Sequence, residues 1–405
     1  MKILLLCNKP PYPATEGGPM AMNSIIQGLL NAGHEVKILA VNNRKYNVTE
    51  ADIPAEYKAK TGIELIDVDL RVKPLNALLN LFTKKSYNIE RFISRDFTKR
   101  LTEVLKSEHF DIVQLEMLHM TPYIETIRKH SKALIVLRAH NVEHKIWERT
   151  AKETKFPPKR WYLNHLAKTL REYELNALET VDGIAAITPK DAAFFRKYCS
   201  KPIIDIPYGV YSEEYVPNYE IDDKPQFYHI GSMNWMPNEE GIRWFINDVL
   251  PDTLKKVPDF VYHLAGRNMP EWLKTLKNEH VDVIGEVPSA REFVANHDVA
   301  IVPLLSGSGI RIKIIESMAM GKTVITTLVG AEGILYDEDV NIIIAENKAK
   351  MVEAIRRINE NPQMAVEIGK AARKLVEETY DNRKIIERLL LFYEQIKPSS
   401  KITFM

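Results

Sequence analysis

The segment at residues 306–321, SGSGIRIKIIESMAMG, constrains the fold of this 405-residue chain more than any other. It follows an apolar run at 299–305 of the kind that forms a strand buried on both faces of a parallel sheet. Two glycines and two serines then permit a tight turn. Apolar residues next recur at helical spacing, at Ile310, Ile314, Ile315 and Met318. The segment therefore predicts a strand, a glycine-rich loop and a helix in succession, which is an α/β arrangement.

A helix that begins after such a loop presents free backbone N–H groups and a partial positive charge, which suit a phosphate. Arg311 and Lys313 add cations in the first turn, and the Glu316 carboxylate follows one turn later, where it can accept hydrogen bonds from ribose hydroxyls. A sugar-nucleotide diphosphate is the simplest ligand that uses all these groups, with its phosphates against Ser306, Gly307, Ser308 and Gly309. The alternative is an ordinary Gly-Ser turn with solvated basic side chains. A cation in the first turn opposes the helix dipole, however, which favours an anionic partner.

Strand and helix signals alternate along both halves of the chain. In the first half we expect strands at residues 2–7, 35–41, 63–68, 111–115, 133–137 and 183–187. In the second half we expect them at 226–230, 260–264, 281–284, 299–303, 323–326 and 342–344. This alternation predicts two Rossmann-like domains, each with a parallel sheet covered by helices on both faces.

The length of the chain also argues for more than one hydrophobic core. Residues 206–224 hold prolines and acidic side chains without clear periodicity, and we interpret them as the connection between domains. We therefore assign an N-terminal acceptor domain to 1–207, a C-terminal donor domain to 208–382 and a final helix within 383–405 that packs back on the first domain. A ligand cleft is expected between the domains, at the carboxyl ends of their strands.

Small and polar residues follow several of the predicted strands, where the crevice of an α/β sheet lies. In the first domain, Gly17 and Gly18 permit a ligand to approach the backbone closely, and His140 can donate to a phosphate or a sugar hydroxyl. A flexible loop and a structural histidine are the alternative interpretations. In the second domain, the residues after three predicted strands leave room for a base and ribose, and Arg267 adds a cation. These residues are Gly231, Ser232, Arg267, Gly285, Glu286 and Val287.

Spacing argues against several familiar sites. No G-x-G-x-x-G follows the first strand, which disfavours a nicotinamide dehydrogenase, and the P-loop-like tail at 321–323 lacks its earlier glycine. Asp67 and Asp69 form a D-x-D string at a strand end, where alternate acids are ordinary, so we expect no metal site and no cofactor. The formal net charge is +1 and no nucleic-acid motif is present, which argues against a nucleic-acid partner.

Two stretches combine basic and aromatic residues, at 71–106 and 145–161. Such surfaces can lie on anionic lipid, and a solvated helix face is the alternative. The apolar run at the N-terminus is too short for a signal-peptide core, and no run approaches the ~20 apolar residues of a spanning helix. We therefore expect a cytoplasmic protein, with peripheral contact at the cytoplasmic face of an anionic membrane left open.

Taken together, these motifs resemble those of the retaining glycosyltransferases of family four, which have the GT-B fold of two Rossmann-like domains facing across a cleft. The resemblance spans nearly the whole chain. Its pieces occur in the family's order, as the paired glycines at 17–18, GHEV at 33–36, the strand end at His140, PYGV at 207–210, GSMNWMPN at 231–238, GEV at 285–287 and KIIESMAMG at 313–321.

The resemblance implies that the second domain binds the donor, with Glu316 on the ribose and with Lys313 and Arg311 on the diphosphate. Residues 285–287 would hold the base, and Gly18 would face the diphosphate from the first domain. His140 would approach the transferred sugar, and we therefore take as the catalytic set His140, Arg311, Lys313 and Glu316.

Two positions depart from the family pattern. Ser308 stands where the family often has a glutamate that contacts the donor sugar. The loop at 231–238 lacks the Arg and Lys that the family often places there, and we expect Arg311 to replace them.

The sequence thus predicts an enzyme that moves a sugar from a nucleotide-diphosphate donor to a glycan or lipid-linked acceptor, with retention and without an essential metal. A sugar-nucleotide epimerase of the same fold is one alternative. A nucleotide- or glycan-binding protein that lost activity with the glutamate that Ser308 replaces is the other.

Overall fold

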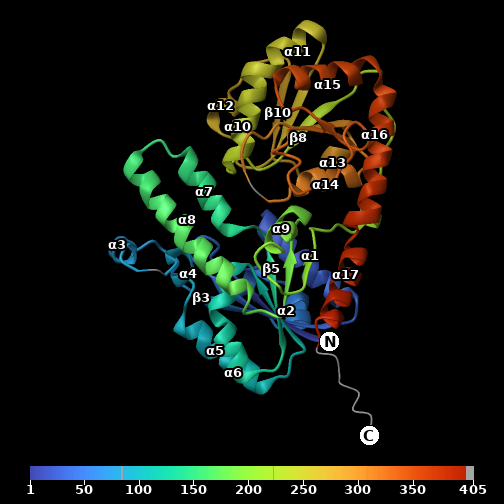
Figure 1. Ribbon diagram of the computed structural model, residues 1–405. Helices are drawn as coiled ribbons and strands as arrows, with labels where there is room; N and C mark the ends of the chain where they lie inside the picture. The colour runs from blue at the N-terminus through green and yellow to red at the C-terminus, as the bar shows by residue number, and fades with distance from the viewer. Residues whose placement is uncertain (84, 222, 308, 398–405) are drawn as a thin grey trace. The chain divides into compact units, whose positions relative to one another are not determined.

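The computed structural model describes residues 1–397 apart from 84, 222 and 308, and its chain divides into two units (Figure 1). The first unit comprises Met1–Pro207 and the C-terminal segment that starts at Ile385, and the second comprises Tyr208–Lys384. Each unit holds one parallel sheet with helices packed on it. The predicted α/β class with two Rossmann-like sheets is therefore confirmed.

The sheet of the first unit has seven parallel strands in the order β3-β2-β1-β4-β5-β6-β7. The bounds are Lys2–Cys7 for β1, Glu35–Asn42 for β2, Glu64–Asp67 for β3, Ile112–Glu116 for β4, Leu134–Ala139 for β5, Gly183–Ala186 for β6 and Ile203–Asp205 for β7. The sequence does not predict β7, because three residues after a proline carry too little periodicity to mark a strand.

Helices cover both faces of this sheet. They are α1 Gly17–Asn31, α2 Ala55–Thr61, α3 Pro74–Asn80, α4 Tyr87–Glu90, α5 Arg95–Ser107, α6 Ile124–His130, α7 Glu143–Glu153, α8 Pro157–Leu178, α9 Pro189–Phe195 and most of α17 Asn382–Gln395, with 3₁₀ turns at Glu50–Asp52 and Leu118–Tyr123. Side-chain caps fix two of the starts, since Ser94 accepts from the Phe97 amide (3.3 Å) and Thr188 from the Asp191 amide (3.0 Å).

Alternate residues of the central strands enter two different cores. On β1, Leu4 and Leu6 join the core beneath α5 and α8, whereas Ile3 and Leu5 join the core beneath α1. A strand buried on both faces has no polar alternation, which is why its sequence is a continuous apolar run. α17 lies in the second of these cores, to which it contributes Ile385, Ile386, Leu389, Phe392 and Tyr393.

The central strands of the first sheet also lie in register at their carboxyl ends. Cys7 of β1 is opposite Glu116 of β4, which is opposite Arg138 of β5. The residues that follow these three strands therefore gather at one place on the sheet edge.

The second unit has six parallel strands in the order β10-β9-β8-β11-β12-β13. The strands are β8 Phe227–Ile230, β9 Tyr262–Ala265, β10 Val281–Gly285, β11 Val299–Val302, β12 Thr323–Thr326 and β13 Ile343–Ile344. The helices are α10 Met236–Trp244, α11 Leu250–Lys256, α12 Glu271–Lys274, α13 Ala290–Ala295, α14 Ile312–Ala319, α15 Lys348–Glu360 and α16 Pro362–Leu375, with π-helical turns at Phe245–Val249 and Val376–Tyr380 and a 3₁₀ turn at Ser212–Glu214. None of the described helices in either unit is long and apolar enough to cross a membrane.

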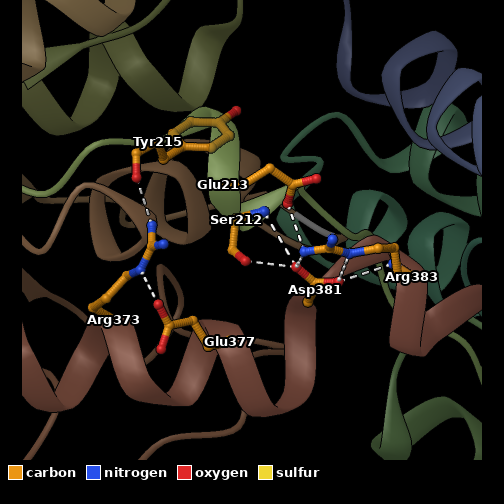
Figure 2. Close-up of polar contacts among 7 residues, drawn as sticks. All are labelled: Ser212, Glu213, Tyr215, Arg373, Glu377, Asp381 and Arg383. Atoms are coloured by element: carbon orange, nitrogen blue, oxygen red, sulfur yellow. Dashed lines mark hydrogen bonds and ion pairs between the residues drawn. The ribbon is translucent and has the colours of Figure 1, made fainter.

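Most of the predicted connection between domains belongs to the second unit, where it is held by the segment that leads into α17. Val210 forms a parallel bridge with Asp381, and the Val210 amide donates to the Tyr380 carbonyl (2.9 Å). The Asp381 carboxylate accepts from the Ser212 hydroxyl (2.6 Å), and Arg383 reaches both Asp381 and Glu213 (Figure 2). These bonds give residues 210–215 a fixed position, although their sequence has no periodicity.

Candidate active site

Backbone bonds join the loops that follow three neighbouring strands of the second sheet. The Gly231 amide donates to the Ala265 carbonyl (3.1 Å), and the Gly266 amide donates to the Gly285 carbonyl (2.7 Å). The structure therefore gathers at one edge the predicted residues Gly231, Ser232, Arg267, Gly285, Glu286 and Val287. Glu286 is exposed and Val287 is half-buried, so this part of the edge is open.

The loop after β11 leads into α14, which begins at Ile312 rather than at the predicted Ile310, with Arg311 at the N-cap position. The Ser306 hydroxyl donates to the Glu240 carboxylate (2.5 Å). Gly307 and Gly309 have φ of 112° and 83°, conformations that residues with side chains rarely adopt. The predicted contact residue Ser308 lies outside the described residues.

The Lys313 ammonium is held by two fixed acceptors. It donates to Asn238 Oδ1 (2.7 Å) and to His229 Nε2 (3.2 Å). His229 Nδ1 lies 3.0 Å from the Ile301 carbonyl, so Nδ1 carries the proton and Nε2 accepts. The Asn238 amide nitrogen donates to the Ser232 carbonyl (2.7 Å), which fixes its oxygen toward Lys313. An ammonium group has three hydrogens, so one remains to donate to a ligand.

Burial lowers the pKa of Lys313 to about 7, and the nearby charge of Arg311 acts in the same direction. Burial, and then the charge of Lys313, holds the pKa of His229 well below its usual value. Among the described residues, no carboxylate forms an ion pair with Lys313. An anion placed beside Lys313 would therefore raise the pKa of this side chain and favour its charged form.

Gly231 has no side chain because the Lys313 ammonium occupies that space. A Cβ built at Gly231 would overlap Lys313 Nζ and would lie 2.8 Å from the Asn238 amide nitrogen. The close approach of the loop to α14 therefore requires glycine at this position.

Arg311, predicted to lie on the diphosphate, is buried, and its guanidinium donates to backbone carbonyls. It donates to the carbonyls of Gly309 and Val329 and lies 5.3 Å from the ring of Trp235. A Cβ at Gly307 would lie 3.1 Å from Arg311 Nη2. Arg311 thus supports the glycine loop from within and adds positive charge behind it.

The Glu316 carboxylate accepts a hydrogen bond from the hydroxyl of Tyr215 (3.1 Å). Burial raises the pKa of Glu316, whereas the bond from Tyr215 and the charge of Arg291 oppose that rise. Tyr215 is itself held, because its carbonyl accepts from Arg373 (2.7 Å), which also pairs with Glu377 (Figure 2). The segment that the sequence marks only as a linker therefore orients a predicted site residue.

In the first unit, α1 begins at Gly17, so both predicted glycines lie in its first turn. A Cβ at Gly18 would lie 2.9 Å from the ammonium of Lys9. The space left by the absent side chain of Gly18 therefore faces Lys9, a basic residue that the sequence analysis did not select.

His140 follows β5 and belongs to a buried charge cluster. Its Nε2 lies 2.7 Å from Glu116 Oε2, which is also 3.1 Å from Arg138 Nη1, and Gln114 donates to the other carboxylate oxygen (2.6 Å). Burial lowers the pKa of His140, so the ring is neutral and Nε2–H donates to Glu116. That tautomer leaves Nδ1 as a hydrogen-bond acceptor.

The carboxylates of the D-x-D string have protein partners. Asp67 accepts from Asn42 (2.9 Å), and Asp69 forms an ion pair with Arg71 (2.8 Å). Across residues 1–397 with their three gaps, no group of three or more His, Cys, Asp or Glu side chains is arranged to hold a metal ion.

Sequence reasoning missed Tyr215, His229 and Asn238 as site residues. Tyr215 lies 101 residues before Glu316 in the chain, so no local spacing could connect them. His229 and Asn238 flank the predicted Gly231, and their polar side chains beside a strand end were a signal that could have been used.

Comparisons with known proteins relate the chain to sugar transferases over part of its length. Residues 224–361 match a family model described as glycosyl transferases group 1. The chain is 22% identical over 421 residues to an uncharacterized 44.6 kDa protein in the cps region of Klebsiella pneumoniae, and the match covers 96% of this chain and 98% of that one.

Solved structures share the whole architecture. A sucrose-phosphate synthase from Thermosynechococcus elongatus superposes with a TM-score of 0.67 at 15% identity, covering 98% of this chain and 99% of that one. Anabaena Alr3699/HepE in complex with UDP superposes with a TM-score of 0.66 at 13% identity, covering 98% and 100%. The fold is therefore GT-B, and the family match together with these neighbours supports a sugar-transferase role.

The pKa of Lys313 makes stability depend on pH. An unfolded lysine holds its proton up to about pH 10.4, whereas folded Lys313 releases it near pH 7, so the unfolded state binds more protons in between. We expect the free energy of unfolding of the wild type to rise relative to Lys313→Met by up to about 1.4 kcal/mol per pH unit between pH 7 and 10. Urea titrations at several pH values between 7 and 10 measure the free energy of unfolding of both proteins. Parallel profiles for the two proteins would contradict the assignment, and Lys277→Met, an exposed lysine, is the control.

The bond from Tyr215 to Glu316 should appear as a coupling energy. We expect Tyr215→Phe to destabilise the protein by about 1 kcal/mol, because it leaves a half-buried carboxylate without its donor. In a double-mutant cycle with Glu316→Gln, the coupling should be about 1 kcal/mol. Additive effects would show that the two side chains do not interact, and Tyr219→Phe serves as a matched control.

Proposed function

We propose that the protein is a glycosyltransferase that moves a sugar from a nucleotide-diphosphate donor to a glycan or lipid-linked acceptor, with retention and without an essential metal. The observation that carries the proposal is the Lys313 ammonium, held by His229 and Asn238 at the start of α14. In this proposal the second unit binds the donor and the first binds the acceptor. Because the Anabaena protein is described in complex with UDP, a uridine nucleotide is the first donor to test.

Donor binding uses the edge of the second sheet. The first-turn amides of α14 and the Lys313 ammonium neutralise the diphosphate, while Arg311 adds charge from behind the loop. Glu316, oriented by Tyr215, accepts hydrogen bonds from the ribose hydroxyls. The backbone of the glycine loop lies beside the phosphates, through Ser306, Gly307 and Gly309. The residues at the open strand ends lie beside the base and ribose, and they are Gly231, Ser232, Arg267, Gly285, Glu286 and Val287.

The chemical step places negative charge on the leaving nucleoside diphosphate as the bond from the anomeric carbon to the phosphate oxygen breaks. Lys313 meets this charge, because a neighbouring phosphate raises its pKa and makes it a full cation. The leaving phosphate oxygen accepts the proton of the acceptor hydroxyl while the new bond forms on the same face of the sugar, which gives retention. His140 Nδ1 accepts a hydrogen bond from the transferred sugar.

Nucleotide binding and turnover test this proposal together. UDP or another nucleoside diphosphate should raise the melting temperature of the wild type by mass action. Lys313→Met should weaken binding at least about tenfold, since a charge-assisted bond is lost, whereas Lys277→Met should not. Transfer to an acceptor should continue in excess EDTA.

Each other outcome has a distinct meaning. If no nucleoside diphosphate binds, the donor site is wrong. Loss of turnover with EDTA would contradict metal independence. Conversion of the nucleotide sugar in the absence of acceptor would indicate an epimerase, and binding without turnover across donors and acceptors would indicate a non-catalytic protein.

Contact with an anionic membrane is part of the same proposal. The two basic-aromatic stretches of the sequence meet in the first unit, because Ala77 of α3, Tyr87 of α4, Ala151 of α7 and Leu163 of α8 share one apolar cluster. Figure 1 shows α7 and α8 as a pair of adjacent helices. Large apolar side chains are exposed on these helices or in the segments that adjoin them, namely Leu79, Phe82, Phe156 and Trp161. The exposed basic residues Lys155, Lys159 and Arg160 lie near Phe156 and Trp161 in the chain. Apolar insertion and charge attraction together suit a lipid surface.

Vesicle flotation tests this contact. The wild type should bind vesicles with phosphatidylglycerol more strongly than neutral phosphatidylcholine vesicles, and added salt should weaken the binding. Lys155→Glu/Lys159→Glu/Arg160→Glu should reduce binding by about a hundredfold or more, since each basic residue contributes about 1 kcal/mol near such a surface. Equal binding by this variant and by the wild type would contradict the proposed surface. Lys350→Glu on α15 is a control.

A further inference from the structure

Two basic side chains near the edge of the first sheet have no carboxylate partner. Lys9 follows β1 and lies 5.5 Å from the ring of Tyr46, and Arg91 follows α4, donates to the Leu70 carbonyl (3.0 Å) and lies over the ring of Tyr87. Both are half-buried, and neither forms an ion pair with any residue that the structure describes. A partly buried charge without a counter-charge is costly to the folded protein, which favours an anionic ligand.

Both charges act on one histidine. His119 follows β4, the neighbour of β1 in the sheet, and its ring lies 4.6 Å from that of Phe92, next to Arg91. Burial, then Arg91 and then Lys9 lower the pKa of His119 to about 4. The ring is therefore neutral, and its buried Nδ1 has no hydrogen-bond partner among the described residues.

Several buried polar atoms on residues that precede these cations in the chain, or that feel the charge of Lys9, have no partner among the described residues. Asn88 lies three residues before Arg91, is 2% exposed and leaves its amide nitrogen without an acceptor, and Arg91 Nε is likewise unpartnered. Asn8 Oδ1 and Glu143 Oε1 are further unpartnered atoms on nearly buried side chains. Native proteins pair almost all buried polar groups, so such a concentration marks a place where hydrogen bonds are made to something else.

The acidic groups considered as counter-charges have other partners, and Glu16, seven residues after Lys9, pairs with Lys45 (3.6 Å) and accepts from the Tyr46 hydroxyl (3.4 Å). Glu116 is bound by Arg138 and His140. Burial raises the pKa of Glu116, but these two partners outweigh burial, so the pKa lies below its usual value. Glu90 pairs with Lys85 (3.4 Å). Burial raises the pKa of Glu143 to about 8, so its carboxyl is uncharged at neutral pH and can donate a hydrogen bond. The positive charge of Lys9 and Arg91 is therefore not cancelled.

We propose that this edge of the first unit is an anion-binding subsite for an acidic saccharide acceptor. Lys9 and Arg91 bind its carboxylate or phosphate, Asn88 and His119 lie beside that group, and Asn8 and Glu143 bond to its hydroxyls. The inference rests on the proposed function for the identity of the ligand as an acceptor. The anionic group of this acceptor can come from two sources, the carboxylate of a uronic acid within a glycan or the phosphate of a sugar phosphate.

Calorimetry on the full chain tests the subsite without turnover. The probes are a glucuronate-terminated oligosaccharide, its glucose-terminated neutral counterpart and a sugar 1-phosphate. We expect one of the two anionic probes to bind at least about tenfold more tightly than the neutral one, with weaker binding at high salt. Lys9→Gln and Arg91→Gln should each weaken binding of the anionic probe about tenfold. Arg95 is an exposed arginine on α5, and Arg95→Gln should leave this binding unchanged.

Further variants separate this subsite from the donor site and from folding defects. Lys313→Met should leave binding of the anionic saccharide unchanged, and Arg91→Gln should leave UDP binding unchanged. Lys9→Arg keeps the charge and should restore binding if Lys9→Gln perturbs the fold. Equal affinity for neutral and anionic probes, or binding that is insensitive to both charge removals, would overturn the subsite. If UDP does not bind but the acidic saccharide does, the proposed function fails and the subsite stands.

Discussion

The Lys313 ammonium is the group around which the second unit is organised. It loses hydration on burial and lies at the positive end of a helix, and both effects oppose a cation. Two acceptors offset them, and each acceptor is fixed by a further bond, His229 by the Ile301 carbonyl and Asn238 by the Ser232 carbonyl. Gly231 lacks a side chain because the ammonium fills that space. A structure that only needed a stable turn would not retain a cation whose pKa falls to about 7.

The first unit shows the same contrast between charges that stabilise the fold and charges left for a ligand. Arg138 and Glu116 are fully buried and form an ion pair where the carboxyl ends of β1, β4 and β5 lie in register. Lys9, after β1, and Arg91, after α4, have no such counter-charge. Lys9 and Lys313 both follow a central strand of their sheet, where the geometry of a parallel sheet collects loops.

The sequence predicts the two sheets well because strands buried on both faces are continuous apolar runs, as β1 and β11 show. It fails at β7, which is three residues long, and it places the start of α14 two residues early. It selects Lys313 and Glu316 because a glycine loop between strand and helix is a local signal, and the structure has both residues on α14 after that loop. It cannot identify Tyr215, whose position depends on Arg373, far away in the chain. It also directs Arg311 toward phosphate, whereas tertiary packing directs it at carbonyls.

The most direct test of the account is the number of protons taken up when UDP binds at pH 8, obtained from titration heats in buffers of different ionisation enthalpy. Lys313 is mostly neutral at that pH without ligand and charged beside a diphosphate, so the account predicts uptake of about one proton by the wild type and none by Lys313→Met. Binding of UDP without proton uptake, or with the same uptake in the variant, would contradict it.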